Sequence, residues 1–579
     1  MTLPSGQANH ESQSPVRNLP RFGNWAFAAA CAAFGLYLLW FAFNTPNVTG
    51  LFDDDAVYQV TAKSLAEGRG YLRIDRPGEP HQTKYPPLYP LILSAFWNLG
   101  GGFPGNIGWL RVPAVISAVA LILLGVRYVA KFTCIGPPAV CVVALACLSL
   151  PEWRLFTTTT MSELPFAALA FAALWATERS ATAAGRKTLA WAATAGTLAG
   201  LALLTRTVGV TLAAAIVLWL CWQRKWVAAA LAAVPALLCA GGWKLWSTVV
   251  TAPEAALRQS PLLRYDLDYS AWFPPTVADA AHVAWQNLVQ FVFLEFQLAL
   301  RLPGRALAEL FKSGNGAPFW HALAWFALLC VIVGWIYSAR TRLSVAHIFI
   351  ALYAGLSLVW PFGPNRFVLP IFPLLIAYLL CGAGVILQLL TTRLSCAVRQ
   401  RFILCLLSLF AIAIVWLNLQ AWPTLFSVKD NVCRMGGMQM SLTAQQQTAE
   451  WLKAHTPPNS IIASRRSSLT YLATGRKTTI LTPYNNPVAY HYSRNRRFDA
   501  FYLPPAPDEW DAVKRDADQL LRLYGELGVT HLIRTGEDEL ERLFFVATEA
   551  CLQANPKRFR IAWIDQRLKV AVLEIVPAP

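Results

Sequence analysis

Long apolar segments are the feature that most restricts how this 579-residue chain can fold. An apolar run of about 17–25 residues can cross a bilayer as a helix, and lipid offers an open backbone no hydrogen-bond partner. We identify about eleven such runs. They lie near residues 25–43, 108–127, 136–151, 162–178, 189–205, 207–222, 226–248, 318–338, 344–361, 366–389 and 402–421. The sequence therefore predicts an α-helical polytopic membrane protein.

Composition agrees with this class and excludes two others. Hydrophobic residues make up 56% of the chain and charged residues only 14%, whereas soluble domains carry about 25% charged residues. The net charge of +17 does not indicate a nucleic-acid partner, because the basic residues are spread between the apolar runs. The twelve cysteines include no C-x-x-C pair, and most lie inside apolar runs as small hydrophobic residues.

Basic residues in alternate gaps predict the orientation, because cytoplasmic gaps carry an excess of lysine and arginine. With a cytoplasmic N-terminus, the inner gaps contain Arg127, Lys131, Arg179, Arg186, Lys187, Arg224, Lys225, Arg340, Arg342, Arg393, Arg399 and Arg401. We expect a cytoplasmic tail (1–24) and a transmembrane domain (25–424) with large outer loops at 44–107 and 249–317. An odd number of spans leaves an extracytoplasmic domain (425–579).

The C-terminal region differs in composition, with charged residues throughout. A helical pattern and three β-like runs lie at 443–455, 460–463, 530–533 and 570–575. Interleaved segments of both types predict one compact α/β domain. A disulfide between Cys433 and Cys551 is left open.

The predicted topology places the unusual polar residues at one membrane face. An acidic triplet (53–55) follows the first span, Glu163 opens the fourth, Arg206 lies between the fifth and sixth, and Arg366 begins the tenth. Together they suit a site that binds an anionic head group and takes a proton from an acceptor. Ordinary explanations stay open, since acids favour helix N-termini and arginines snorkel to the interface.

The first outer loop contains two further predicted features. Residues 56–67 have small and apolar side chains at helical spacing, which predicts a short interfacial helix. The apolar segment 91–99, after the proline-rich stretch 85–90, is too short to span. The chain has no Walker loop, dinucleotide fingerprint, G-x-S-x-G or zinc-type histidine pair, so nothing couples it to ATP or a soluble nucleotide.

Six motifs, in order along residues 50–390, resemble those of GT-C glycosyltransferases. The closest resemblance is to the bacterial relatives of protein O-mannosyltransferases and lipid A aminoarabinose transferases. The motifs are Asp54-Asp55-Ala56-Val57-Tyr58, Tyr85-Pro86-Pro87-Leu88-Tyr89-Pro90, Leu110-Arg111-Val112-Pro113, Met161-Ser162-Glu163, Leu204-Thr205-Arg206 and Arg366-Phe367-Val368-Leu369-Pro370. The resemblance implies a GT-C membrane fold in a bacterial inner membrane. It also implies inverting transfer of a sugar from a polyprenyl-phosphate donor to a glycan, lipid or protein acceptor at the outer face.

The resemblance also implies residue roles. Asp54 is the expected general base with Asp55 as its neighbour, and Glu163 is the second acid. The residues expected to bind the donor phosphate or the substrate are Arg206, Arg366, Tyr58, Lys84 and Tyr85.

Asp53 departs from the usual acidic pair and leaves the identity of the base ambiguous by one residue. It also creates an Asp53/Asp55 pair that could hold Mg²⁺ or Mn²⁺. We favour no metal cofactor, because arginine alone can neutralise a phosphate.

Two other functions fit a polytopic chain. A transporter or lipid flippase needs polar residues near the middle of the membrane on broken helices, whereas here they lie at the ends of predicted spans. A function as a sensor or assembly protein would explain the C-terminal domain, but it does not explain the cluster of acids and arginines. We therefore rank the transferase first and the transporter second.

Overall fold

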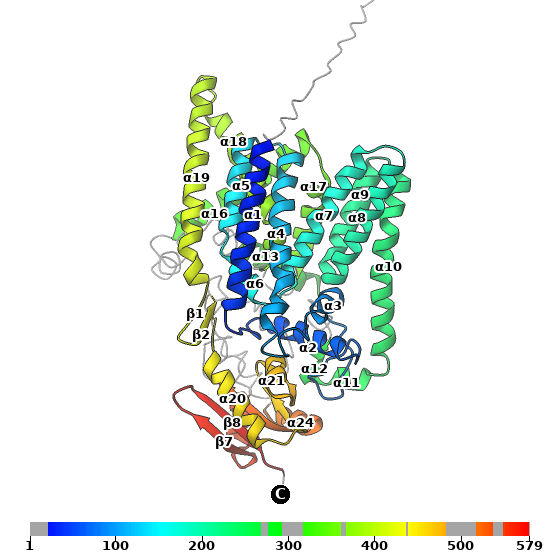
Figure 1. The fold of residues 1–579 in the computed structure, drawn as a ribbon, viewed down its shortest axis with the longest axis vertical. Helices are drawn as coiled ribbons and strands as arrows, with labels where there is room; N and C mark the ends of the chain where they lie inside the picture. The colour runs from blue at the N-terminus through cyan, green and yellow to red at the C-terminus, as the bar shows by residue number, and fades with distance from the viewer. Residues whose placement is uncertain are drawn as a thin grey trace, which may run out of the picture.

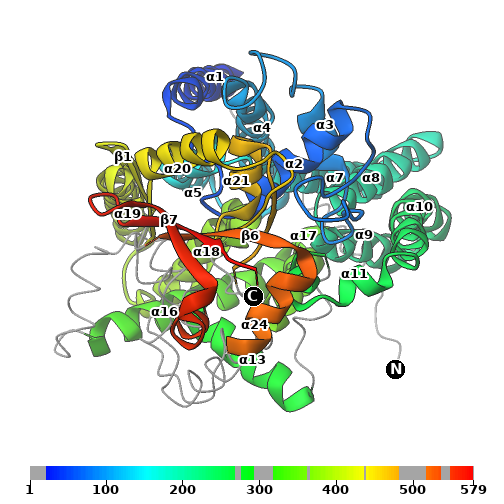
Figure 2. The ribbon, with the colours of Figure 1, turned by 90° about the horizontal axis from the view of Figure 1, so that it is seen from below.

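The computed structural model describes residues 21–267, 276–291, 317–360, 366–435, 438–481, 517–535 and 548–577. A bundle of helices forms the larger part, and a smaller α/β unit packs against one end of it (Figure 1). We call this end the site end, because α1 (Arg21–Asn44) ends there and α2 (Asp54–Ala66) begins there. Figure 2 views the molecule from that side. Most of the predicted N-terminal tail, and residues 268–275 and 292–316 of the second large loop, lie outside the described residues.

Each predicted apolar run coincides with a helix. Besides α1, these are α4 (Ile107–Phe132), α5 (Pro137–Ser149), α7 (Glu163–Thr182), α8 (Arg186–Thr205), α9 (Val210–Trp222), α10 (Trp226–Thr251), α16 (Ala317–Thr341), α17 (Val345–Val359), α18 (Phe372–Leu390) and α19 (Cys396–Leu425). Among the described residues, seven helices are long and apolar enough to cross a membrane. The count is eight if α5 and α6 (Glu152–Thr158), bent by 47°, form one span. The chain is a multi-pass membrane protein, as predicted.

Small residues bring the helices of the bundle into close contact. Gly334 of α16 and Gly382 of α18 face each other's backbone so closely that a Cβ on either would overlap it, and Gly196 of α8 meets Ala232 of α10 in the same way. Burial of apolar side chains contributes little to helix association inside lipid, because lipid tails are themselves apolar. Membrane helices are therefore held together by such close packing. Leucines such as Leu237 on α10 and Leu409 on α19 stay exposed, as a lipid-facing surface requires.

Short elements cover the site end. They are α2, α3 (Leu88–Ser94), η1 (Thr207–Gly209), α11 (Ala255–Gln259), α12 (Pro261–Leu267), α13 (Val277–Gln290) and η5 (Leu369–Ile371). The helix predicted at 56–67 is confirmed as α2. The apolar segment predicted at 91–99 lies partly in α3 and partly in the turns that follow it.

In its described residues, the C-terminal unit contains two sheets. An antiparallel sheet consists of β1 (Phe426–Lys429), β2 (Val432–Met435) and β3 (Met438–Ser441). The second has the order β5-β4-β6-β8-β7, from β4 (Ile461–Ala463), β5 (Lys477–Thr479), β6 (Val529–Thr535), β7 (Phe559–Asp565) and β8 (Val570–Ile575). Its described helices include α20 (Leu442–His455), α21 (Ser467–Thr474), α24 (Ala517–Leu527) and η7 (Pro556–Arg558). The predicted helix at 443–455 and the three predicted strands are confirmed.

Two features of this unit bear on the site. Strands β4, β5 and β6 are parallel, with Ile462 paired to Thr478 and His531, and α21 connects β4 to β5. The turn after β4 therefore lies at the carboxyl edge of the parallel strands. Cys433 and Cys551 are both buried, and no disulfide joins them in the structure.

Candidate active site

A tight loop between α1 and α2 sets the position of the acidic triplet. Arg111 of α4 is buried and donates hydrogen bonds of 2.6–2.8 Å to the carbonyls of Ala42, Thr45, Pro46 and Thr158. It thereby ties the end of α1 to the end of α6. The Leu110-Arg111 motif thus has a structural task in this chain: it fixes the frame from which the loop departs.

Asp55 shapes this loop from inside. Its fully buried carboxylate accepts hydrogen bonds from the backbone N–H groups of Gly50 (2.9 Å) and Phe52 (3.3 Å). Burial raises the pKa of Asp55 to about 7, and the Asp53 charge adds to the rise. Both of its oxygens are engaged by the loop, so Asp55 serves the geometry of the loop.

Asp54, by contrast, joins a chain of charges with three other predicted residues. Both terminal nitrogens of Arg366 donate to Asp54 Oδ2 at 3.0 Å, and Arg366 lies 3.7 Å from Glu163. The buried Glu163 also pairs with Arg206 at 2.7 Å. The structure thus brings together four side chains from α2, α7, the α8–η1 junction and the segment before η5.

Aromatic and hydroxyl groups complete this cluster. Tyr85 donates a 2.5 Å hydrogen bond to Asp54 Oδ1, and its ring lies 5.0 Å from that of Tyr58. Tyr58 and Ser162 share a 2.9 Å hydrogen bond, and Arg206 donates to the same Ser162 oxygen at 3.1 Å. Tyr58 and Tyr85, which were predicted to bind substrate, therefore lie directly against this cluster of charged side chains.

The cluster keeps Asp54 ionised. Burial by itself would raise the pKa of Asp54, but the charges of Arg366 and Lys84 and the Tyr85 hydroxyl outweigh it, so the pKa lies below its usual value. Burial lowers the pKa of Lys84 to about 8, against the opposing effect of Asp54 and Asp266. Asp54 is half-buried and its side chain is 20% exposed, so a substrate can reach this carboxylate.

Asp53 points elsewhere. Its carboxylate pairs with Arg465 of the C-terminal unit, whereas Asp55 binds the loop backbone. The two carboxylates proposed as an alternative metal pair therefore have different partners. In the described part of the chain, no three His, Cys, Asp or Glu side chains are grouped so that they could hold a metal ion.

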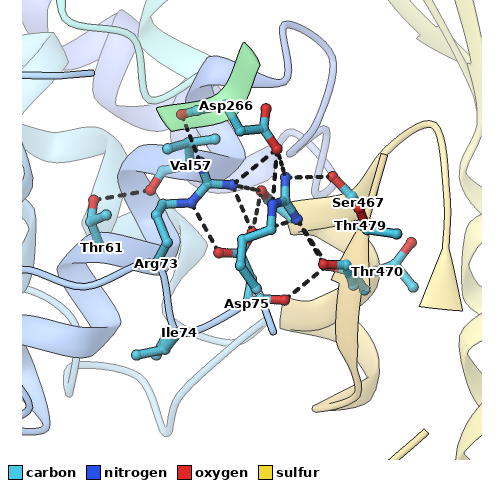
Figure 3. Close-up of polar contacts among 12 residues, drawn as sticks. Val57, Thr61, Arg73, Ile74, Asp75, Asp266, Ser467, Thr470 and Thr479 are labelled. Carbon is cyan, nitrogen blue, oxygen red and sulfur yellow. Dashed lines mark hydrogen bonds and ion pairs between the residues drawn. The ribbon is translucent and has the colours of Figure 1, made fainter. Parts of the chain in front are cut away.

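Sequence reasoning missed a second, buried ion cluster (Figure 3). Arg73 binds Asp75 through two bonds of 2.9 Å, Arg76 lies 3.0 Å from Asp75, and Arg76 also pairs with Asp266 of α12. Ser468 of α21 donates to Asp75 at 2.7 Å. The Arg73–Arg76 segment carries charges of both signs, but its partners outside the segment, Asp266 and Ser468, lie 190 or more residues away in the chain.

The site end also holds a cationic cavity of about 520 Å³. It is lined by Thr83, Lys244, Ser247, Thr248, Thr251, Arg258, Gln259, Arg264 and Leu267. Four of these residues follow one another at helical spacing from Lys244 to Thr251 and form a polar stripe at the end of α10. Arg258 pairs with Glu254 at 2.6 Å and donates to Thr83 at 2.8 Å. The lining thus carries three basic groups, of which Arg258 is paired with a carboxylate.

Comparison with known proteins identifies the fold. No family model and no curated protein matches the chain. Crystal structures of ArnT from Cupriavidus metallidurans, one bound to undecaprenyl phosphate and one apo, match with TM-scores of 0.51 at 11% identity. They cover 95% and 96% of this chain and 98% of theirs. The apo oligosaccharyltransferase of Archaeoglobus fulgidus matches with a TM-score of 0.50 at 12% identity, over 89% of this chain and 70% of that one.

These neighbours are GT-C glycosyltransferases, and the chain has their fold. The predicted fold class is confirmed: an α-helical polytopic membrane protein of the GT-C type with a C-terminal α/β part.

Proposed function

We propose that this protein is an inverting glycosyltransferase that moves a sugar from a polyprenyl-phosphate donor to an acceptor hydroxyl. The observation that carries the proposal is the state of Asp54: accessible, ionised, and held by Arg366 and Tyr85 at the site end of a GT-C bundle. The ArnT structure with bound undecaprenyl phosphate supports the donor class.

The chemistry follows from these groups. Asp54 takes the proton of the acceptor hydroxyl as its oxygen forms a bond to the anomeric carbon of the donor sugar. The bond from that carbon to the phosphate oxygen breaks on the opposite face, and the phosphate leaves with the electron pair. Because the phosphate ester already activates the donor, a base with a lowered pKa is sufficient. Glu163 holds Arg206 and Arg366 in place, and the arginines balance the charge of the two acids.

The cationic cavity is our proposed location for the donor phosphate. Arg206 and Arg366 are each paired with an acid. In the cavity Arg258 is paired with Glu254, which leaves Lys244 and Arg264 as the cations proposed to bind the phosphate. Exposed leucines on α10, Leu237 and Leu238, continue from the cavity along the bundle and fit a prenyl tail.

The cavity and the charged cluster around Asp54 include residues that are close together in the sequence. Thr83 lines the cavity, and Tyr85, two residues later, donates to Asp54. Two residues of chain span at most about 7 Å, so these two positions lie within roughly 7 Å of each other. We therefore propose that a sugar bound through its phosphate at Lys244 and Arg264 extends past Lys84 towards Asp54.

We also propose that the site end faces outwards from a bacterial inner membrane, with the N-terminus cytoplasmic. In Figure 1 the N-terminal end of α1 lies at the opposite end of the bundle from the C-terminal unit. Every second gap between the predicted spans is rich in lysine and arginine, as expected for gaps on the cytoplasmic side.

A donor screen in detergent tests the proposal. Purified protein is incubated with radiolabelled polyprenyl-phosphate pentoses and hexoses, with and without EDTA, and transfer and hydrolysis are measured. Turnover that is insensitive to EDTA supports a base mechanism without a metal, and turnover lost with EDTA reassigns Asp53 and Asp55 to a metal site. Tight donor binding with no turnover of any donor supports the transporter instead.

A further inference from the structure

The C-terminal unit contacts the loop that carries Asp54. Arg465, in the turn after β4, pairs with Asp53, and its neighbour Arg466 donates a 2.8 Å hydrogen bond to the carbonyl of Gly50. Leu469 of α21 packs against Gly50, where an added Cβ would lie 3.1 Å from the leucine Cβ. Two cations from a segment more than 400 residues away in the chain thus hold Gly50 and Asp53, the two ends of the four-residue stretch that precedes Asp54.

The backbone between those two contacts has an unfavourable conformation. Asp53 has φ 61° and ψ −47°, and the N–H of Asp54 donates to the carbonyl of Phe52 at 2.7 Å. This is a γ-turn of the rare form with positive φ, which is strained for a residue that has a Cβ. Such a conformation persists only where its surroundings impose it. Arg465 binds the side chain of the strained residue itself.

The γ-turn decides where the carboxylate of Asp54 lies. Asp54 follows the strained residue directly and is the first residue of α2. Rotation of the Asp53 backbone towards an ordinary conformation would break the Phe52–Asp54 hydrogen bond and swing Asp54 relative to Arg366 and Tyr85. Asp55, which binds Gly50 and Phe52, holds the loop from the inside, and the two arginines hold it from the outside.

Separate contacts dock the C-terminal unit. Arg76 donates to Ser467 at 2.8 Å, Ser468 donates to Asp75 at 2.7 Å, and Thr478 N–H donates to the Asp75 carbonyl at 2.7 Å. These buried bonds fix α21 and β5 without using Arg465. The contact between Arg465 and Asp53 is therefore not needed to keep the unit in place.

We propose that Arg465 and Arg466 are positioning residues for the transfer reaction: they hold the strained turn at Asp53 and so aim Asp54 at the acceptor. The C-terminal unit is then a working part of the active site. This inference rests on the proposed function, with Asp54 as the base.

The test measures kcat and donor KM of Arg465→Gln with radiolabelled polyprenyl-phosphate sugars. A displacement of a reacting group by about 1 Å costs on the order of 100-fold in rate. We expect kcat to fall by about 10- to 100-fold while donor KM changes by less than about 3-fold. Arg465→Lys keeps a charge near Asp53 and should recover part of the loss. Arg560→Gln, which removes an exposed pair with Glu574 in the same sheet, is the matched control and should match wild type.

A second pair of variants separates positioning from folding. Asp53→Asn removes the same ion pair from the bundle side and should reduce kcat to a similar extent. Asp53→Gly in the Arg465→Gln background should regain turnover, because glycine adopts positive φ without steric cost.

Unchanged kcat in both Arg465→Gln and Asp53→Asn overturns the inference. Release of the C-terminal unit from Arg465→Gln by limited proteolysis also overturns it, in favour of a docking role. Full turnover in Asp54→Asn, by contrast, refutes the proposed base and with it the proposed function.

Discussion

Arg366→Gln should raise the pKa of Asp54 and move the acid limb of the turnover profile to higher pH. Both terminal nitrogens of Arg366 lie 3.0 Å from Asp54 Oδ2. Burial by itself would raise this pKa, and the Arg366 charge, together with Lys84 and Tyr85, keeps it below its usual value. A general base must be ionised, so a variant with a raised pKa loses its active form first at low pH.

The size of the shift follows from this geometry. Unit charges 3.0 Å apart attract each other by roughly 5 kcal/mol at an effective dielectric constant of about 20. Water and the new amide offset part of that loss, and an arginine neighbour usually lowers a carboxyl pKa by about 1–3 units. We therefore expect the acid limb to rise by about 1–3 pH units, which corresponds to about 1.4–4 kcal/mol between the two protonation states.

The assay is kcat/KM for donor turnover from pH 4 to 9, because this ratio reports the groups of the free enzyme. In wild type, kcat/KM should show no acid limb at a pH above the usual pKa of a carboxyl group. In Arg366→Gln an acid limb should appear between pH 4 and 9. Arg206→Gln is the control, since its guanidinium contacts Glu163 and Ser162; it should lower turnover without moving the limb. An identical acid limb in wild type and Arg366→Gln would refute the reasoning.

Three further outcomes are expected. Glu163→Gln leaves Arg206 beside a neutral buried partner and should cost about 3 kcal/mol of stability; an unchanged thermal midpoint in detergent would contradict this. For Asp55, burial raises the pKa from 3.8 to about 7, so its ionisation lowers stability as the pH rises from about 4 to 7. Asp55→Asn should remove that part of the pH dependence of the thermal midpoint, and a profile parallel to wild type argues against it. Lys244→Gln and Arg264→Gln should each raise donor KM by about 10-fold, the loss of one charge-assisted contact, with kcat retained; a fall in kcat at constant KM would place the phosphate elsewhere.

The helices of this fold could be predicted from apolar runs alone, because bilayer thickness sets a minimum length that no soluble helix needs. The limits of that rule show at α5. Its predicted span, 136–151, ends in a bend at Leu150 and Pro151, where α6 continues in a different direction. The helix at 56–67 could also be predicted from the sequence, because its small and apolar residues recur at helical spacing.

The gathering of Asp54, Glu163, Arg206 and Arg366 at one end of the bundle was also predictable, because alternating spans return to the same end. The motif pointed to Asp54, which does face that cluster, but it left the choice within the triplet ambiguous by one residue. Neighbouring acids look alike in the sequence, and the choice depends on the positive φ of Gly50 and Asp53 and on hydrogen bonds from the loop backbone. The partner of Asp53 could not be found either, because Arg465 belongs to a different fold unit and no local pattern links the two.

The measurement that tests the central claim most directly is transfer by Asp54→Asn, compared with Asp53→Asn, Asp55→Asn and the distant control Asp565→Asn. General base catalysis usually contributes 10²- to 10⁴-fold. The account predicts that Asp54→Asn loses at least about 100-fold in kcat while still binding the donor, more than either neighbour, and that Asp565→Asn matches wild type. Turnover by Asp54→Asn within a few-fold of wild type would contradict it, and a complete loss only in Asp53→Asn or Asp55→Asn would move the base to that residue.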